Sequence, residues 1–271
     1  MSKSILNQKQ IDAFHEQGFV RIDGLFDDQE MQQLERACDQ VYDKARKLVE
    51  SGTADADRNT VVSDGARFSF QSGGDGMAVR HVAWCGQAEP IFDRFGQDEK
   101  LLRIVGELLG CDEVSQLINQ VHYKKPGTGV KFDWHQDSEH RGIHTGQFED
   151  VLGNGSYVQI AVAIDDVEAD SGPLGFIPRS NQHKFLGKLY NDQGEFCCDK
   201  VDESDEVYPL LKRGDAVAFG SYTIHGSRAN TGKSARRTFI NGFAAPGADK
   251  KKPSLPGEGR ILKIPGFASV S

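Results

Sequence analysis

The sequence lacks the features of several protein classes. No apolar run approaches the roughly 20 residues that a membrane-spanning helix needs, and the opening MSKSILNQKQ has no apolar signal-peptide core. Basic residues are in the minority, with 32 Lys and Arg against 40 Asp and Glu. Because phosphate binding depends on clustered Lys and Arg, this balance argues against a nucleic-acid partner and against an anionic membrane surface.

Cysteine is also scarce, and its spacing excludes a disulfide or zinc framework. The five cysteines are odd in number, two of them are adjacent, and no CxxC pair occurs; they are Cys38, Cys85, Cys111, Cys197 and Cys198. A disulfide scaffold or a structural zinc site would need paired spacings. We therefore expect reduced thiols in a cytoplasmic protein.

What is present is enough material for one large domain. The chain has 271 residues, of which 38% are hydrophobic, and it includes sixteen Phe. The spacing of apolar residues predicts a long helix over 28–50, with Asp27 or Asp28 as its N-cap, and another helix over 97–110. The polar, Gly-rich stretches 51–59 and 63–77 are expected to be loops.

From about residue 115 the pattern changes to short β-rich runs that are separated by Gly, Pro, Asp and Asn. QLINQVHYKK, SYVQIAVAIDDV, DAVAFGSYTIHGS and RTFINGFAA are examples, and no helical run of useful length lies between them. This pattern predicts a mainly β fold with flanking helices and a jelly-roll core rather than a parallel α/β sheet. We expect a single domain over 1–271, with a helical part over about 1–112, a β core over about 113–246 and a tail over 247–271.

The stretch KFDWHQDSEH, residues 131–140, carries the first chemical signal. His135 and Asp137 are two residues apart, so in an extended strand both side chains point to one face. A third ligand is expected near the end of a later strand, and His225 occupies such a place, 88 residues after Asp137. Two His and one carboxylate on a β scaffold match the facial triad of non-haem Fe(II) oxygenases, which leaves coordination positions vacant.

Two arginines follow His225 on a predicted core strand, where one of them could bind a ligand. Arg236 and Arg237 lie eleven and twelve residues after it, and one of them must point into the barrel if RTFINGF is a core strand. A buried guanidinium needs a carboxylate partner, which a dicarboxylate bound to the iron could supply through a bidentate pair of hydrogen bonds. Strand alternation alone leaves the choice between the two arginines open.

At this point the sequence resembles the phytanoyl-CoA dioxygenase family of iron- and 2-oxoglutarate-dependent oxygenases. The resemblance lies in WHQDS at 134–138, SGPLGFIPRS at 171–180 and the stretch RGDAVAFGSYTIHGSRANTGKSARRTF from 213, and the opening IDAFHEQGFVRIDGLFDDQEM is similar too. It implies a double-stranded β-helix, which is a cupin-like jelly roll.

The same resemblance implies roles for single residues. His135, Asp137 and His225 would bind iron, and Arg236 would hold the distal carboxylate of 2-oxoglutarate. Ser227 matches a position that often hydrogen-bonds the same carboxylate. Arg80 falls near a position where some members carry a lysine that contacts this co-substrate.

Further candidates line the predicted strands and loops. One of His122 and Tyr123 must face the barrel, and we expect it to be Tyr123, whose phenol could bond the co-substrate carboxylate or simply pack in the core. Gln159 either lines the pocket or points outward. At Ala161 some members carry a bulky aromatic residue, so the alanine would widen the pocket for substrate.

Three loop features are left with alternatives. Arg179 stands in IPRSN where IPGSH is common in the family, and it is either a substrate anchor or a solvated charge. His140 and His144 are either additional contacts or solvated loop residues. The acidic run 195–207 is expected to be an exposed loop and a candidate lid.

The function that we expect is hydroxylation of a small molecule with Fe(II), 2-oxoglutarate and O2, which releases succinate and CO2. Related halogenases carry Gly or Ala at the position of Asp137, so its presence favours hydroxylation, although desaturation stays open. Two other classes are considered: a barrel that only binds a small molecule, and a zinc-type hydrolase or isomerase on a cupin-like barrel.

Overall fold

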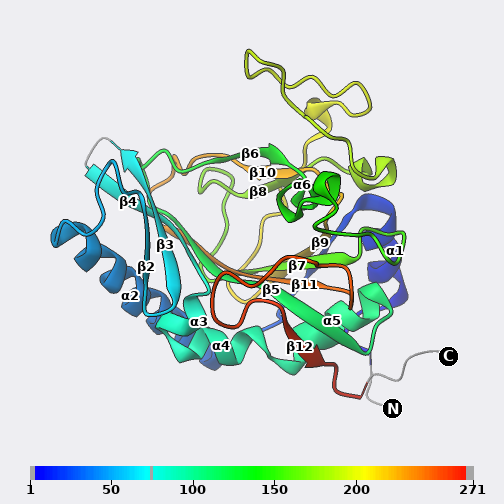
Figure 1. The fold of residues 1–271 in the computed structure, drawn as a ribbon, viewed down its shortest axis with the longest axis horizontal. Helices are drawn as coiled ribbons and strands as arrows, with labels where there is room; N and C mark the ends of the chain where they lie inside the picture. The colour runs from blue at the N-terminus through cyan, green and yellow to red at the C-terminus, as the bar shows by residue number, and fades with distance from the viewer. Residues whose placement is uncertain (1–3, 74–75, 267–271) are drawn as a thin grey trace.

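The computed structural model describes residues 4–73 and 76–266, and it shows two antiparallel sheets that face each other (Figure 1). The smaller sheet has three strands in the order β6-β10-β8, namely β6 (Phe132–His135), β10 (His225–Ser227) and β8 (Leu174–Phe176). The larger sheet has nine strands, of which β12 (Arg260–Lys263) pairs with β5 beside the main order. That order is β1 (Phe19–Ile22), β9 (Ala216–Gly220), β7 (Tyr157–Ala163), β11 (Arg236–Ala244), β5 (Glu113–Lys124), β4 (Gly76–Ala83), β3 (Ala66–Gly73) and β2 (Thr60–Ser63).

Helices α2 (Asp28–Glu50), α3 (Cys85–Ala88), α4 (Pro90–Gly96) and α5 (Glu99–Leu109) lie on the outer face of the large sheet, below it in Figure 1. Helix α2 begins with a capping box between Asp27 and Glu30, so Asp27 is the N-cap. Its buried face, which includes Leu34 and Val41, contributes to the main apolar core. Besides these, the chain forms helices α1 (Gln8–Gln17) and α6 (Asp137–Arg141), with short 3-10 turns η1 (Ile143–Thr145), η2 (Ser180–His183) and η3 (Glu203–Asp205).

The N-terminal part is less helical than the sequence predicted. The expected loop over 63–77 is largely an antiparallel hairpin of β3 and β4, and β2 also joins the large sheet. Phe68 and Phe70 alternate with polar residues and are buried, which is the pattern of a half-buried strand. The surrounding Gly, Ser and Asp obscured this pattern. The jelly-roll prediction itself is confirmed.

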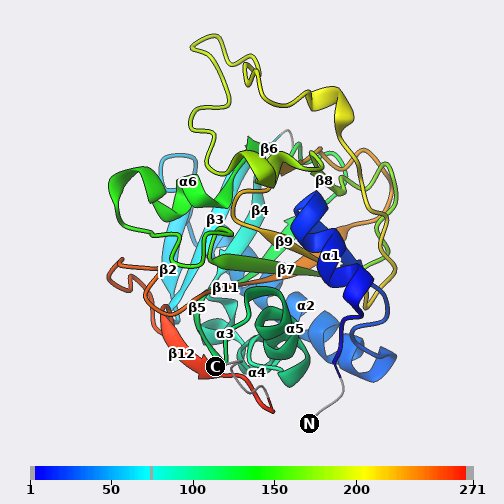
Figure 2. The ribbon, with the colours of Figure 1, turned by 90° about the vertical axis from the view of Figure 1, so that its right-hand side faces the viewer.

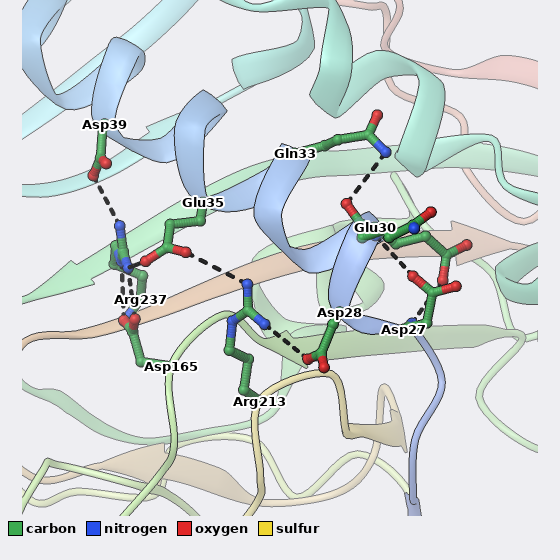
Figure 3. A network of polar contacts seen from close by, with 10 residues as sticks. Asp27, Asp28, Glu30, Gln33, Glu35, Asp39, Asp165, Arg213 and Arg237 are labelled. Atoms are coloured by element: carbon green, nitrogen blue, oxygen red, sulfur yellow. Dashed lines mark hydrogen bonds and ion pairs between the residues drawn. The ribbon is translucent and has the colours of Figure 1, made fainter.

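A network of ion pairs holds α2 against the sheet (Figure 3). Arg237 donates from Nη2 to Asp165 Oδ1 at 2.6 Å and from Nη1 to Asp39 Oδ1 at 2.8 Å, and it also contacts Glu35 at 3.1 Å. Arg213 reaches the same helix through Glu35 and the first residue of α2. Arg237 therefore points away from the space between the sheets.

The segment between η2 and β9 projects from the body of the molecule (Figures 1 and 2). Its acidic run 195–207 is largely exposed, as the sequence predicted. Among the helices that the structure describes, none is long and apolar enough to cross a membrane.

Candidate active site

A cavity of about 690 Å³ lies between the two sheets and contains most of the predicted site residues. Strands β4, β5, β7 and β11 of the large sheet form one side of it, and β6, β10 and α6 form the other. The three residues that the sequence proposed as metal ligands, His135, Asp137 and His225, all line this cavity.

The two histidines lie side by side on adjacent strands of the small sheet. His135 ends β6, His225 begins β10, and the two are direct partners in the antiparallel register, with ring centroids 4.2 Å apart. Asp137 begins α6, and its Oδ1 lies 4.0 Å from His135 Nε2 and 3.8 Å from His225 Nε2. Three potential ligand atoms therefore lie within 4.8 Å of one another.

The protonation of this group suits a divalent cation. Nδ1 of His135 lies 2.8 Å from the carbonyl of Asp133, and Nδ1 of His225 lies 3.0 Å from the carbonyl of Thr223. A carbonyl only accepts, so each Nδ1 carries the proton and each Nε2 keeps its lone pair. Burial lowers the pKa of His135 to about 3 and that of His225 to about 4, so both rings are neutral.

Asp137 completes the fit to a metal ion. Its Oδ2 is buried and has no hydrogen-bond partner among the residues that the structure describes. A buried carboxylate oxygen without a partner is costly unless a cation or a donor occupies the adjacent space. Two neutral imidazoles and one carboxylate are the donor set of a non-haem iron site, and they leave coordination positions for other ligands.

A second polar group, made of two buried cations and a hydroxyl, lies at one end of the cavity. Lys124 ends β5 and Arg236 begins β11, and they are register partners. Lys124 Nζ donates to Ser227 Oγ at 2.8 Å and to the carbonyl of Arg228. Arg236 Nη1 donates to Thr238 Oγ1 at 2.6 Å, while its Nε is buried without a partner.

Neither cation of this pair has a carboxylate within ion-pair distance in the described part of the chain. Burial lowers the pKa of Lys124 to about 6 and that of Arg236 to about 10, because both ammonium and guanidinium lose their water. Buried cations are normally paired, so this end of the cavity is suited to an anion. Sequence reasoning missed Lys124, although alternation with Gln120 and His122 places it on the cavity face.

The prediction for Tyr123 is wrong. Its side chain lies on the opposite face of β5, where the hydroxyl donates to the carbonyl of Cys38 in α2 at 2.8 Å. His122 faces the cavity instead, and its ring packs against His81 and Phe132 with centroids 5.2 and 4.9 Å away. Strand alternation permits only one of His122 and Tyr123 inside, and the helix carbonyl satisfies the phenol.

Arg80 lies on the cavity wall. Its guanidinium carbon stacks 4.3 Å from the centre of the Phe132 ring, and its Nε is buried without a partner. Burial lowers the pKa of this guanidinium. The register between β3 and β4 shifts between Ser69 and Phe70, so Arg80 is an extra, unpaired residue of β4, and it lines the cavity together with its neighbour His81.

Of the predicted substrate residues, one lines the cavity and two do not. Gln159 lines the cavity, and its Oε1 accepts a hydrogen bond from Tyr157 Oη at 2.7 Å. Ala161 does not line it; its methyl group lies in an apolar cluster with Phe176 and Val217 behind the wall. Arg179 is exposed and pairs with Glu16 at 3.5 Å, so it is a solvated charge outside the cavity.

Of the two loop histidines, one lines the cavity and the other does not. His140 lines the cavity, with its ring centroid 4.9 Å from that of His135. His144 lies outside the cavity, where it stacks on Phe185. His140 is thus a neighbour of the metal-binding group, whereas His144 belongs to the surface.

The register of the large sheet shows that the cavity has two distinct ends. Arg236 is opposite Lys124, and along β11 Ile240 is opposite Gln120 and Gly242 is opposite Gln159. On the small sheet Ser227 bonds to Lys124, whereas His225 lies two residues nearer to α6. The metal-binding group therefore lies between the Lys124–Arg236 end and the end formed by Gln159 and α6.

Comparison with known proteins agrees with this geometry. The sequence profile described as Phytanoyl-CoA dioxygenase (PhyH) matches residues 14–238, which is most of the chain. The chain belongs to the phytanoyl-CoA dioxygenase family. The expected class of enzyme, a non-haem iron dioxygenase that uses 2-oxoglutarate, is confirmed by this membership.

Several relatives in this family are similar over much of their length. An ectoine dioxygenase of Stutzerimonas stutzeri is 26% identical over 214 residues, which cover 70% of this chain and 68% of the relative. The phytanoyl-CoA dioxygenase domain-containing protein 1 of Danio rerio is 23% identical over 271 residues, which cover 87% of this chain and 89% of the relative.

Solved structures share the fold. The carbocyclase SnoK from nogalamycin biosynthesis, described as non-haem and α-ketoglutarate-dependent, superposes with a TM-score of 0.64 at 18% identity, covering 95% of this chain and 97% of SnoK. EctD from S. alaskensis with 2-oxoglutarate and 5-hydroxyectoine gives a TM-score of 0.65 at 22% identity, covering 93% and 81%. These similarities support the jelly-roll fold of this chain.

Proposed function

We propose that this protein hydroxylates a small molecule, using iron held by His135, Asp137 and His225 and a 2-oxoglutarate whose distal carboxylate binds at the Lys124–Arg236 end. The observation that carries the proposal is the presence, in one cavity, of three converging metal donors and a separate buried cation pair. A hydrolase would have no use for that cation pair. A protein that only binds a ligand would have no use for vacant metal positions.

The chemistry comes from the bound groups, and the protein supplies position and charge. Iron and 2-oxoglutarate together would couple decarboxylation of the co-substrate, to succinate and CO2, with insertion of one oxygen atom of O2 into a substrate C–H bond. The carbonyls of Asp133 and Thr223 keep each imidazole in the tautomer that presents Nε2 to the metal. These backbone contacts also orient the rings before any ligand binds.

Lys124, Ser227 and Arg236 would hold the distal carboxylate. Ser227 Oγ and Arg236 bring neutral and charged donors to one point, and Lys124 adds an amine that becomes charged beside an anion. Charge-assisted hydrogen bonds of this kind are short and strong, and Arg can form two of them in parallel. Arg80 lines the same cavity, and its contact with the co-substrate stays a prediction.

The direct test needs no substrate. Purified apoprotein is mixed anaerobically with Fe(II) and 2-oxoglutarate, and the visible spectrum is recorded. We expect a metal-to-ligand charge-transfer band from 2-oxoglutarate that chelates the iron through two oxygens, followed by a screen for substrates by succinate release. Iron binding without this band would contradict the proposal and favour a binding barrel or another kind of metalloenzyme.

The affinity for 2-oxoglutarate should depend on pH through Lys124. Its pKa of about 6 makes it a neutral amine above pH 7, and a carboxylate beside it restores the ammonium form. Binding should therefore take up close to one proton between about pH 7 and pH 9, so the Kd rises with pH. His81 and His122 have lowered pKa values and stay neutral in this range.

Calorimetry in buffers of different ionisation enthalpy measures this proton uptake. Lys124→Met should remove the uptake and flatten the pH dependence of the Kd. Lys125→Met changes an exposed neighbour, so it should leave both unchanged. A wild-type Kd that is constant from pH 7 to pH 9 would contradict the assignment of Lys124.

The same lysine should lower the stability of the protein without ligands. Because the folded pKa lies below the unfolded value of 10.5, protonation favours the unfolded chain, and stability is lost as pH falls from 10.5 toward 6. Lys124→Met should therefore raise the free energy of unfolding at pH 7 by roughly 1–3 kcal/mol. Urea denaturation measures the difference, and a less stable variant would contradict the prediction.

A further inference from the structure

The end of the cavity opposite Arg236 carries an arginine that the proposed function has not used. Arg141 ends α6, four residues after Asp137, and it lines the cavity. Its guanidinium carbon lies 5.8 Å from the centre of the Tyr157 ring. Its Nε is buried without a partner, and no carboxylate of the described residues lies within ion-pair distance of it.

The sheet register separates Arg141 from the co-substrate end. Tyr157, over which Arg141 lies, is opposite Ala244, whereas Lys124 is opposite Arg236. Eight residues of β11 separate these two pairs, which is about 26 Å of strand. A five-carbon dicarboxylate that reaches from Arg236 to the metal-binding group therefore does not extend to Arg141.

Gln159 adds a second donor at the same end. Its Oε1 already accepts from Tyr157 Oη at 2.7 Å, which leaves its NH2 group as a donor on the cavity wall. A stacked guanidinium and an amide NH2 are the groups that bind a carboxylate or a phosphate in water-poor sites. Neither group is matched by an acceptor on this wall.

Other charges near Arg141 do not replace an anionic ligand. Asp249 interacts with it electrostatically but forms no ion pair, and Asp249 Oδ1 is itself buried without a partner. Lys251 adds positive charge nearby, with its Nζ donating to the carbonyl of His140 at 2.7 Å. The charges of Fe(II) and 2-oxoglutarate nearly cancel, because Fe(II) brings two positive charges and 2-oxoglutarate brings two negative ones.

We infer that the substrate of this enzyme carries an oxyanion, a carboxylate or a phosphate, which Arg141 and Gln159 bind at the α6 end of the cavity. This inference rests on the proposed function, because it assigns the remaining cavity to the substrate. The oxyanion would fix one end of the substrate, so that the carbon to be oxidised lies beside the metal-binding group.

The test compares matched acids and neutral analogues. Protein saturated with 2-oxoglutarate and Fe(II) under anaerobic conditions is titrated calorimetrically with hexanoate and hexanamide, benzoate and benzamide, and hexyl phosphate and hexanol. We expect at least one anion to bind about 10- to 100-fold more tightly than its neutral partner, as charge-assisted hydrogen bonds imply. The carboxylate and phosphate arms distinguish the two kinds of oxyanion.

Variants separate Arg141 from general electrostatics. Arg141→Gln should abolish the preference for anions, whereas Arg179→Gln, which removes the same charge from an exposed loop, should retain it. Asp249→Asn should bind the anion at least as tightly as the wild type, because it removes a nearby negative charge.

The remaining outcomes are equally decisive. Equal binding of acids and amides, binding of none of the anions, or an unchanged preference in Arg141→Gln would each overturn the inference. The charge-transfer band reports on the proposed function independently. If the band forms while the anion preference is absent, the oxygenase assignment stands and the substrate is uncharged at this end.

Discussion

Asp137→Ala is expected to lower 2-oxoglutarate-dependent turnover by at least about 100-fold, since changes in groups that only support metal ligands already cost 10- to 100-fold. Asp137 supplies the carboxylate of the three-residue group that it forms with His135 and His225. Its Oδ1 lies within 4.0 Å of the Nε2 atoms of both histidines. Two neutral imidazoles alone hold Fe(II) weakly, so the charge-transfer band should also disappear.

The apoprotein of this variant should remain folded. Asp137 Oδ2 is buried without a partner among the residues that the structure describes, so in the absence of metal the alanine removes a buried oxygen that makes no hydrogen bond. We expect the free energy of unfolding of metal-free Asp137→Ala to equal or exceed that of the wild type, as measured by urea denaturation.

Asp133→Asn is the matched control for Asp137→Ala. Asp133 is also a cavity-lining aspartate, but it is exposed and pairs with Lys131 at 2.9 Å. Its backbone carbonyl, which orients His135, is unchanged by the substitution. This control should keep its band and its turnover. If Asp137→Ala retained more than about a tenth of wild-type turnover, the metal-ligand assignment would be wrong, because a ligand should matter more than its supporting groups.

Arg236→Ala should raise the Kd of 2-oxoglutarate by about 100-fold, because two charge-assisted hydrogen bonds to one carboxylate are lost together. Arg236 is buried, Nη1 donates to Thr238, and Nε has no partner among the residues that the structure describes. The Kd is measured by titrating 2-oxoglutarate into the Fe(II) protein and following the band. Arg236→Lys should recover part of the affinity, since it restores the charge without the planar pair of donors.

The neighbouring residue provides an unusually close comparison. Arg237 lies on the other face of β11 and pairs with Asp165, Asp39 and Glu35 (Figure 3). Arg237→Ala should leave the Kd of 2-oxoglutarate unchanged and lower the free energy of unfolding by roughly 1–3 kcal/mol, since it leaves carboxylates unpaired that are only partly exposed. If both variants weakened 2-oxoglutarate binding equally, Arg236 would have no specific role.

The parts of the site that follow from short spacings were readable from the sequence. His135 and Asp137 are two residues apart, and His225 precedes a Gly- and Ser-rich loop at the end of a β-rich run. These three residues could therefore be proposed as metal ligands without knowing how the strands pair. Arg236 and Ser227 were implied by the family resemblance, which relates both to His225 by their distance along the chain. The structure brings all five residues to one cavity.

The errors came from features that alternation leaves undetermined. On β5 the alternation shows that His122 and Tyr123 point to opposite faces, but only the packing of α2 decides which face is the core. The family motif left Arg179 as either a substrate anchor or a solvated charge, and only the structure shows that the chain turns there and exposes it beside α1. The β3–β4 hairpin was missed because its Gly and Ser content is that of a loop, although its cross-strand partners are close in the sequence.

The sequence by itself determined the class of the fold, the three candidate metal ligands and the distance from His225 to Arg236, because ligand chemistry and strand periodicity are local properties. Only the tertiary structure decided that Lys124 and Arg236 are register partners at one end of the cavity and that Arg141 lies at the other. Those positions depend on how strands pair across the sheet and where α6 turns, and pairing is set by burial of side chains from many separate segments.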